Sequence, residues 1–494
     1  MAVDEQARLQ GEEPDEAEYV EKVPSKSDDI RRWYTAVWQL GQLADYSPVR
    51  GCMVIRPYGF TLWENMVERL DARFKATGHR NAYFPLFVPE RLLIREAEHV
   101  EGFAPQVAWV TEAGGKKLTE RLAIRPTSEA IIGTSYSKWV RSWRDLPILI
   151  NQWCNVVRWE LRTRPFLRTT EFLWQEGHTV HRTEEEAQAE TMQMLEVYRD
   201  FVETELAIPV IKGRKSEAEK FPGANATYTI EALMPDGLAL QSGTSHNLGQ
   251  NFARAFDIAF QDVDGERRYA WTTSWGLSTR TVGALILVHG DDAGLIMPPR
   301  VAPTQVVIIP IPGRTEEDDR AVRETVEQLR SRLGARFRVE ADWSDNRPGW
   351  KFSEWELRGV PLRLEVGPRD VKQGQVRVVR RDTREKQDLP LAGLEDALSG
   401  LLDAVQQHLF QRALEFREAH TFDADDYATF RRLIEQPGGF VRARWCGSAE
   451  CEARIKEETG ATIRCLPLEA PLDRGPCLIC GADSERRALF ARSY

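Results

Sequence analysis

The stretch RWELRTRPFLRTTEFLWQEGH, residues 158–178, is the most informative part of this chain. It follows the apolar run ILINQWCNVV (148–157), which predicts a buried strand. An arginine at the end of such a strand, here Arg158, presents a fixed fork of donors to phosphate or carboxylate. Two strands joined by this basic loop would suit a nucleotide, with Phe172 available to stack on a base. The alternative is a basic hairpin that only faces solvent.

The motifs that the chain lacks narrow this interpretation. It contains no GxxxxGK[ST] loop, no GxGxxG after a strand and no HExxH. If the protein uses ATP, arginine forks and magnesium must therefore neutralise the phosphates. A second arginine, Arg280, closes the segment TSWGLSTR (273–280) just before an apolar helix. Two arginines on separate elements would make a plausible clamp for a triphosphate.

The sequence around this stretch predicts a domain of mixed helices and strands. Residues 59–77 carry apolar side chains at helical spacing. The run AYFPLFV (82–88) predicts a strand at an edge or an interface, because Pro85 cannot donate to a ladder. Thr183 and Glu186 have the spacing of a capping box that opens a long helix. We also expect strands near 227–243 and 255–260, then a turn and helix at 275–289.

A second unit is expected after the proline-rich linker MPPRVAP (297–303). Strand and helix patterns alternate in it, which favours an α/β module with a mixed or parallel sheet. The expected elements are strands at 304–311, 336–340, 361–366 and 375–380 and a helix at about 315–334. From about residue 390 the pattern predicts helices and then a cysteine-rich segment.

Five of the seven cysteines fall between residues 446 and 480. In a reducing compartment such a cluster favours a metal over disulfides. Two short pairs, Cys446 with Cys451 and Cys477 with Cys480, have the spacing that holds one zinc ion tetrahedrally. The pattern offers no open position, so we expect a structural site. Cys465 lies between the pairs, and free structural thiols are the alternative.

Length and charge exclude several other classes of protein. The chain has 494 residues, of which 42% are hydrophobic and 29% are charged, as in an ordinary globular enzyme. We expect a soluble cytoplasmic protein, because no run is long enough to span a membrane and the start is acidic. Residues 1–29 carry ten acids against three basic residues, whereas residues 347–386 carry eleven basic residues against six acids. That basic patch is a candidate site for a polyanion, or simply a solvated strand face.

Together these motifs resemble the class II prolyl-tRNA synthetases, in the form that lacks an editing insertion and carries a C-terminal zinc domain. The similarity covers nearly all of residues 30–494. Residues 78–85, 153–176 and 273–290 resemble the three class motifs, while GWKFSEWELRGVPLRLEVGPRD (349–370) and the terminal Ser493-Tyr494 are similar to this family in particular.

The resemblance implies a fold of the α/β (α+β) class with three domains after an acidic tail. They are an antiparallel-sheet catalytic domain, an α/β anticodon-binding domain and a small zinc-binding domain. The expected division is 1–29 for the tail, then 30–296, 297–400 and 401–494.

The resemblance also implies a proline site. Thr127 and Glu129 would bind the amino acid, with Glu129 on its secondary amine, and Arg158 would bind its carboxylate. Ser274 and Gly276 would border the substrate, and the other residues shaping the pocket would be Trp174, Glu176, His178, His246, Phe103 and Phe221. Considered singly, His246 would more often be a structural histidine, and Trp174 and Phe221 core residues.

For ATP, the resemblance implies a larger set of contacts. Arg158 and Arg280 would be the catalytic residues, with Phe172 stacked on adenine and Mg²⁺ on the phosphates. The remaining ATP-binding residues would be Glu160, Arg168, Thr169, Gln241, Thr244 and Ser278. Since the carboxylate of proline is already ionised, its attack on the α-phosphorus needs no general base.

The function expected from the resemblance is proline–tRNA ligase activity, with L-proline, ATP and tRNA(Pro) as substrates. The similarity also implies a homodimer that meets near Pro85. One alternative is a non-catalytic tRNA-binding paralogue, and another is a class II enzyme that activates a different small amino acid or a carrier protein. The intact Arg158, Glu129 and Arg280 disfavour the first, and the tRNA-type stretch at 349–370 disfavours the second.

Overall fold

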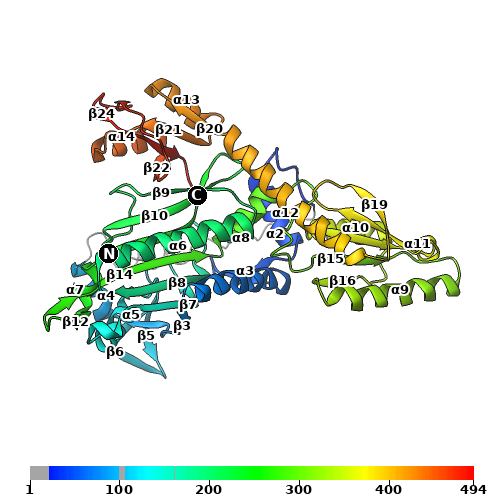
Figure 1. Ribbon diagram of the computed structural model, residues 1–494, viewed down its shortest axis with the longest axis horizontal. Helices are drawn as coiled ribbons and strands as arrows, with labels where there is room; N and C mark the ends of the chain where they lie inside the picture. The colour runs from blue at the N-terminus through cyan, green and yellow to red at the C-terminus, as the bar shows by residue number, and fades with distance from the viewer. Residues whose placement is uncertain (1–21, 100–105, 161) are drawn as a thin grey trace, which may run out of the picture.

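The computed structural model describes residues 22–99, 106–160 and 162–494. An eleven-stranded sheet runs through the molecule, a five-stranded sheet lies to one side of it, and a three-stranded sheet and three strand pairs complete the strands of the described residues (Figure 1). Among these residues, no helix has the length and apolar character that a bilayer crossing requires.

The helices lie between and over the sheets. Their bounds are α2 Ile30–Leu40, α3 Pro57–Ala76, α4 Glu90–His99, α5 Glu129–Trp139, α6 Glu184–Thr204, α7 Asn251–Phe256, α8 Arg280–His289, α9 Glu316–Gly334, α10 Pro348–Leu357, α11 Pro368–Gln373, α12 Leu394–Ala419, α13 Tyr427–Glu435 and α14 Ala449–Thr459.

The large sheet has the strand order β20-β21-β25-β22-β9-β10-β11-β14-β8-β7-β3. It is antiparallel except at its two ends, where β20 pairs with β21 and β3 with β7 in parallel. In chain order its strands are β3 Arg80–Asn81, β7 Ile148–Val157, β8 Glu171–His181, β9 Val210–Arg214, β10 Ala226–Leu233, β11 Ala239–Gly249, β14 Trp271–Ser278, β20 Thr421–Ala424, β21 Phe440–Arg444, β22 Thr462–Pro467 and β25 Arg487–Ala491.

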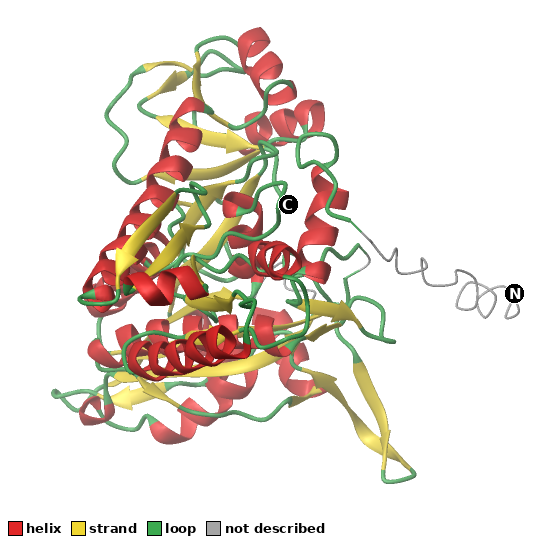
Figure 2. Cartoon of the chain, turned by 90° about the vertical axis from the view of Figure 1, so that its right-hand side faces the viewer, coloured by secondary structure: helices red, strands yellow, loops and turns green. Residues whose placement is uncertain are grey.

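The smaller sheets are peripheral to this one. The hairpin of β5 and β6 extends from the bottom of the molecule (Figure 1 and Figure 2). The remaining strands are β1 Ala44–Tyr46, β2 Met53–Ile55, β4 Phe87–Pro89, β5 Trp109–Ala113, β6 Lys116–Ile124, β12 Ala259–Gln261, β13 Arg267–Tyr269, β15 Val306–Pro310, β16 Val339–Ala341, β17 Leu362–Val366, β18 Gln375–Arg380, β19 Lys386–Pro390, β23 Gly475–Pro476 and β24 Asp483–Ser484.

Helices cover one face of the central sheet, while α5 and α7 pack on part of the other face, near Val180 and Leu248. The helices α2, α3, α6 and α8 share one apolar core with Trp275 and Leu277 of β14 and Ile230 of β10. Helix α6 begins where the capping-box spacing predicted, since the Thr183 hydroxyl accepts from the Glu186 amide. The Glu186 carboxylate accepts from the Arg182 amide rather than from Thr183.

The 304–390 region forms the expected mixed sheet, in the order β16-β15-β17-β18-β19. Strand β15 pairs in parallel with β16 and β17, while β18 is antiparallel to both of its neighbours. The linker 297–303 is largely buried, and Met297, Val301 and Ala302 pack in the core of the preceding domain. Helix α12 runs through residue 400, where the sequence division placed a boundary.

Three local expectations were wrong. Residues 82–88 do not form one strand, because Pro85 lacks an amide and the Phe84 amide donates to the Gln152 side chain instead. The pattern at 255–260 belongs to the end of α7 and the start of β12, separated at Asp257 with φ of 59°. The turn expected from 275 lies later, because β14 continues to Ser278 before α8 begins.

Candidate active site

Three neighbouring strands of the central sheet bring the predicted substrate residues into rows. The register pairs Ser274 of β14 with both His246 of β11 and His178 of β8. The next row pairs Gly276 with Thr244 and Glu176. Because every second side chain of a strand points to the same face, these residues form one wall.

The residues between them face the core. The Tyr198 hydroxyl of α6 donates to Gln175 Oε1 at 2.7 Å, and the Trp275 ring packs against Phe74 with the centroids 4.9 Å apart. A Cβ on Gly177 would lie 2.1 Å from the Trp275 indole, so only glycine fits at that position. The alternation of β8 therefore separates binding residues from packing residues.

Glu176 is the centre of a buried polar cluster. Its carboxylate accepts from Gln152 Nε2 at 3.0 Å, from the Ser128 hydroxyl, and from His178 Nε2 at 3.2 Å. Burial favours the neutral acid, but these hydrogen bonds hold the pKa of Glu176 below its usual range. Burial likewise opposes protonation of His178, yet Glu176 and Glu129 raise its pKa. The cluster therefore carries an ionised Glu176 carboxylate, which favours the protonated form of the neighbouring His178.

Glu129 completes this cluster from the start of α5. The Thr127 hydroxyl donates to its carboxylate, and both side chains are buried. Ligand atoms of Glu129, Glu176 and His178 lie within 4.8 Å of one another. Two buried carboxyl groups this close together, one of them the ionised Glu176, form a site that suits a cation.

The opposite side of this recess is built around His246. Its Nδ1 lies 2.9 Å from Thr227 Oγ1, and the Phe221 ring lies over it with centroids 4.7 Å apart. Burial lowers the pKa of His246 to about 3, with a smaller contribution from His178, so this ring is neutral. Ser274 Oγ is buried and has no hydrogen-bond partner within the described part of the chain. An unsatisfied buried hydroxyl of this kind is available to a substrate.

The arginines converge beside this recess. The guanidinium of Arg158 lies over two aromatic rings, 5.5 Å from the centroid of Phe172 and 5.3 Å from that of Trp174. Its Nε donates to the Pro126 carbonyl at 3.0 Å, which fixes its direction. Arg158 is exposed, so its fork can reach a ligand.

Arg280 and Arg168 add to the positive charge. Burial lowers the pKa of Arg280 to about 10, and repulsion from Arg158 and Arg168 contributes to this shift. Its Nε donates to the Leu167 carbonyl at 2.9 Å, whereas Arg168 pairs with Glu160 at 2.7 Å. Three guanidinium groups that lie close enough to repel one another form a site for a polyanion.

The other predicted ATP residues border the same face. Ser278 Oγ accepts from the Arg280 amide at 3.2 Å, and Thr169 is buried in the loop between β7 and β8. The pairing of β10 with β11 shifts between Ile230 and Glu231 of β10, so that Gln241 of β11 lies opposite Glu231. This bulge inserts Ser242 and directs Gln241 to the same face as Thr244. Phe103 lies outside the described residues.

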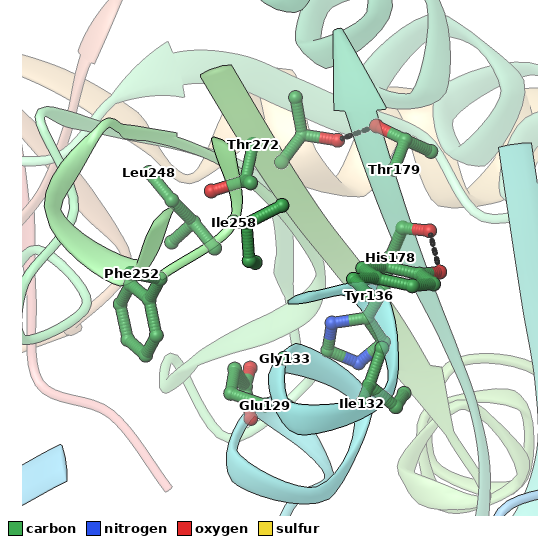
Figure 3. A pocket seen from close by; sticks show the side chains of 11 residues that line it. Glu129, Ile132, Gly133, Tyr136, His178, Thr179, Leu248, Phe252, Ile258 and Thr272 are labelled. Carbon is green, nitrogen blue, oxygen red and sulfur yellow. Dashed lines mark hydrogen bonds between the residues drawn. The ribbon is translucent and has the colours of Figure 1, made fainter. Parts of the chain in front are cut away.

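A small cavity of about 20 Å³ lies behind Glu129 and His178 (Figure 3). Phe252, Leu248 and Ile132 form apolar walls, and the Tyr136 hydroxyl donates to the His178 carbonyl at 2.8 Å. The volume is that of a single water molecule. The floor beneath the charged cluster is therefore closely packed.

Sequence reasoning missed several residues that hold this site. Ser128, Gln152 and Cys154 surround Glu176, and Thr227 contacts His246. Gln152 and Cys154 occupy alternate positions of the predicted strand 148–157, a period of two that could have indicated a shared face. Their partner could not be read without the β7–β8 register, which pairs Gln152 with Glu176.

The four predicted zinc ligands lie together in the C-terminal unit, away from the site on the central sheet. Their sulfur atoms lie within 4.8 Å of one another, with Cys446 Sγ 3.8 Å from Cys451 Sγ and 3.7 Å from Cys480 Sγ. Four thiols at this separation fit a tetrahedral zinc site. Cys465 is not part of the cluster, because it is buried on β22 against Gly213.

Comparison with known proteins agrees with this geometry. Residues 109–289 match the family model described as the tRNA synthetase class II core domain (G, H, P, S and T). Residues 305–401 match an anticodon binding domain, and residues 427–494 match the model described as prolyl-tRNA synthetase, C-terminal.

Similar proteins cover almost the whole chain. A proline–tRNA ligase of Natranaerobius thermophilus is 54% identical over 97% of this chain and 99% of its own length. This chain belongs to the prolyl-tRNA synthetase family. Other members of the family are similarly close: one from Roseiflexus sp. is 57% identical over 96% of the chain and 99% of its own length, and one from Symbiobacterium thermophilum is 54% identical over 97% and 100%. The family and fold expected from the sequence are confirmed.

Proposed function

We propose that this chain is a proline–tRNA ligase, which joins L-proline to ATP as prolyl-adenylate and transfers the prolyl group to the 3′ end of tRNA(Pro). The observation that carries this proposal is the meeting of an anionic, buried cluster and a cationic group of arginines on one sheet face. The first suits the ammonium of proline, and the second suits a triphosphate.

In the proposed activation step, Glu129 and Glu176 bind the secondary ammonium of proline. Arg158 binds the proline carboxylate and the α-phosphate, so that two anions are held together in line. The carboxylate oxygen attacks the α-phosphorus, the bond to the bridging oxygen breaks, and pyrophosphate leaves with that electron pair. Arg280 and Arg168 lie where they would stabilise the leaving phosphates. Magnesium bound to the triphosphate further screens its charge.

The pocket walls have a role in selectivity in this proposal. His246, Trp174, His178 and Phe221 would enclose the small ring, and the buried Ser274 hydroxyl would meet the substrate. Phe172 would stack on adenine, while Gln241, Thr244, Thr169, Glu160 and Ser278 would line the nucleotide site. Rejection of an amino acid that differs by one methylene is worth only about 1–3 kcal/mol. We therefore expect measurable activation of alanine or cysteine.

Three further properties belong to this proposal. Zn²⁺ bound by Cys446, Cys451, Cys477 and Cys480 would be structural, since the donor set offers four thiolates. A homodimer is supported by the exposed Tyr83, Phe87 and Trp139 beside Pro85. The free thiols fit a cytoplasmic protein.

The test is amino-acid-dependent exchange of pyrophosphate into ATP, measured without tRNA for all twenty amino acids. Proline should give the highest rate, and alanine or cysteine a low rate at high concentration. Arg158→Ala should reduce proline-dependent exchange about 100- to 1,000-fold, as the loss of a transition-state donor does. The matched control is Arg162→Ala, since Arg162 is exposed in the same loop.

The outcomes separate the alternatives. Absence of exchange with every amino acid, from folded protein with magnesium, would favour the non-catalytic paralogue. Exchange led by another amino acid would contradict the proline assignment. Equal activity of Arg158→Ala and wild type would contradict the role of Arg158.

A further inference from the structure

A short segment without regular structure, residues 215–221, connects the proposed proline pocket to the C-terminal unit. It lies between β9 and β10 of the central sheet. Its first residues contact the C-terminal unit, and its last residue contacts His246. The Lys215 amide donates to the Thr227 carbonyl of β10 at 2.8 Å, and beyond this bond the conformation of the segment depends on side-chain contacts at both ends.

The pocket end of this segment is Phe221. The Phe221 amide donates to Thr227 Oγ1 at 2.9 Å, and the same oxygen lies 2.9 Å from His246 Nδ1. The Phe221 ring also stacks on Phe252, with centroids 6.3 Å apart. Any displacement of the segment therefore changes both the aromatic wall and the hydrogen bonding of His246.

The other end is held by helix α14 of the C-terminal unit. The Ser216 hydroxyl donates to Glu452 Oε1 at 2.6 Å, and both side chains are buried. One turn further along the helix, Lys456 Nζ pairs with Glu219 Oε1 at 3.2 Å. The buried bond is the stronger of the two, since the Lys456 side chain is largely exposed.

A buried ion cluster fixes the residue before Ser216. Lys215 Nζ lies 2.9 Å from Glu231 Oε1, and Arg464 of β22 lies 3.0 Å from Glu231 Oε2. All three side chains are at least nine-tenths buried. Two elements of the C-terminal unit, α14 and β22, thus grip the start of the segment whose end forms the pocket wall.

We infer that Glu452 is a positioning residue for proline, acting through Ser216 and the 215–221 segment on Phe221 and His246. This inference rests on the proposed function. When the Glu452 contact is lost, the segment samples other conformations, and the fraction of enzyme able to bind proline falls. The apparent dissociation constant for proline rises in inverse proportion to the fraction of enzyme that can bind it. The arginines lie outside this segment, with Arg158 and Arg168 in the loop between β7 and β8 and Arg280 at the start of α8, so ATP binding is unaffected.

The experiment compares variants by pyrophosphate exchange at varied proline and varied ATP. Glu452→Ala should raise KM for proline about tenfold, the expected effect of losing one charge-assisted hydrogen bond. Its kcat and its KM for ATP should stay within about twofold of wild type. Glu452→Gln should restore KM for proline, because an amide oxygen also accepts from the Ser216 hydroxyl.

Two further variants keep the test independent of folding. Ser216→Ala should raise KM for proline as Glu452→Ala does, and the double variant should be no worse than either single one. Arg454→Ala is the control, because Arg454 lies on α14 in an exposed pair with Glu458. Thermal unfolding of each variant verifies that it is folded.

Each outcome has a definite meaning. If wild type gives no proline-dependent exchange, the proposed function fails and takes this inference with it. If wild type is active and both Glu452→Ala and Ser216→Ala leave KM for proline within twofold, only the positioning role is overturned. Equal losses in kcat, KM for ATP and KM for proline would also overturn it, since they indicate general damage.

Discussion

The two units that follow the catalytic core in the sequence are attached to it in different ways. The five-stranded sheet of the anticodon unit has its own core, to which the catalytic domain contributes Ala207 and Ile296 as its only buried members in the described part of the chain. The C-terminal unit instead continues the catalytic sheet, because β22 pairs with β9. Figure 1 shows the C-terminal unit above the central sheet and the anticodon unit to its right, with α12 running between them.

The close contact at β9 illustrates the second kind of attachment. A Cβ on Gly213 would lie 2.4 Å from Cys465, so the two strands meet without space for a side chain. One buried apolar cluster contains Leu233 and Ala239 of the catalytic strands together with Leu489 of β25. A shared sheet transmits displacement directly, whereas a contact between separate cores can adjust. We therefore expect substitutions in the C-terminal unit to change the rate of amino-acid activation. Substitutions in the anticodon unit should instead change the charging of tRNA.

The largest effect is expected from the proposed zinc site. Cys477→Ser should reduce bound zinc from one per chain to none and unfold the C-terminal unit, since such sites contribute about 10 kcal/mol in small domains. Proline-dependent exchange should then fall as the β9 edge is exposed. Metal content and hydrogen exchange of the amides of β22 report these changes. Cys52→Ser is the control, and full exchange activity without zinc would contradict the shared-sheet argument.

The next largest effect is expected at the ion cluster that joins the two parts. Arg464→Ala should lower the free energy of unfolding by about 3 kcal/mol, because buried Glu231 loses one of its two cationic partners. Arg442→Ala removes an exposed pair with Asp423 in the same unit and should cost under about 1 kcal/mol. Denaturant unfolding measures both. Equal losses in the two variants would mean that the buried ion cluster stabilises the protein no more than an exposed ion pair does.

A smaller effect is expected from acid at the end of α8, where α12 meets the core. Burial lowers the pKa of His289 to about 3, and Arg412 and Lys26 contribute. In the unfolded chain His289 binds a proton near pH 6.5, whereas in the folded chain it stays neutral down to about pH 3. The stabilisation of the folded state is therefore complete above pH 6.5 and is lost as the pH falls toward 3.

The measurement is the free energy of unfolding at pH 7 and pH 5. From pH 7 to pH 5, His289 should account for a loss of about 2 kcal/mol. His289→Gln should remove about that much from the pH dependence, while the rest of the acid-induced loss remains. An unchanged pH dependence in the variant would exclude His289 as its source.

The smallest effect on stability is expected at the anticodon joint. Arg381 donates to Asp291 Oδ2 at 2.9 Å, and Asp291 remains about one-third exposed. Arg381→Ala should cost about 1 kcal/mol and leave proline-dependent exchange unchanged. Charging of tRNA(Pro) should lose a few-fold in kcat/KM, because the anticodon unit is held less firmly. If Arg381→Ala lost more proline-dependent exchange than Arg464→Ala, the anticodon unit rather than the C-terminal unit would be the one coupled to amino-acid activation.

The sequence predicted the elements that carry long, regular patterns. Strand 148–157, helix 315–334 and the α/β alternation of the second unit follow from periodicity, and the structure has all three. The short apolar run at 255–260 was wrongly interpreted, because period alone cannot separate a buried helix end from a strand. The run at 82–88 was wrong because proline interrupted its ladder.

The site was predictable only through combined motifs. The residues of β8 that face the recess, among them Trp174 and His178, alternate in the sequence, and the family resemblance assigns their roles. The partners of Glu176 were not predictable, since Ser128 and Gln152 reach it from other elements. Arg464 lies 233 positions from Glu231, and no local pattern reports such a contact.

The pairing of β22 with β9 also has a consequence during synthesis on the ribosome. Strand β9 ends at Arg214, and its outer neighbour begins at Thr462, 248 positions later. At about 5–20 residues per second, the outer edge of β9 stays unpaired for about 12–50 s after it emerges. An open strand edge is a template for aggregation, and charged residues discourage such pairing. Strand β9 has the sequence VIKGR, and its Lys212 and Arg214 place positive charge on this edge until the C-terminal strands have been synthesised.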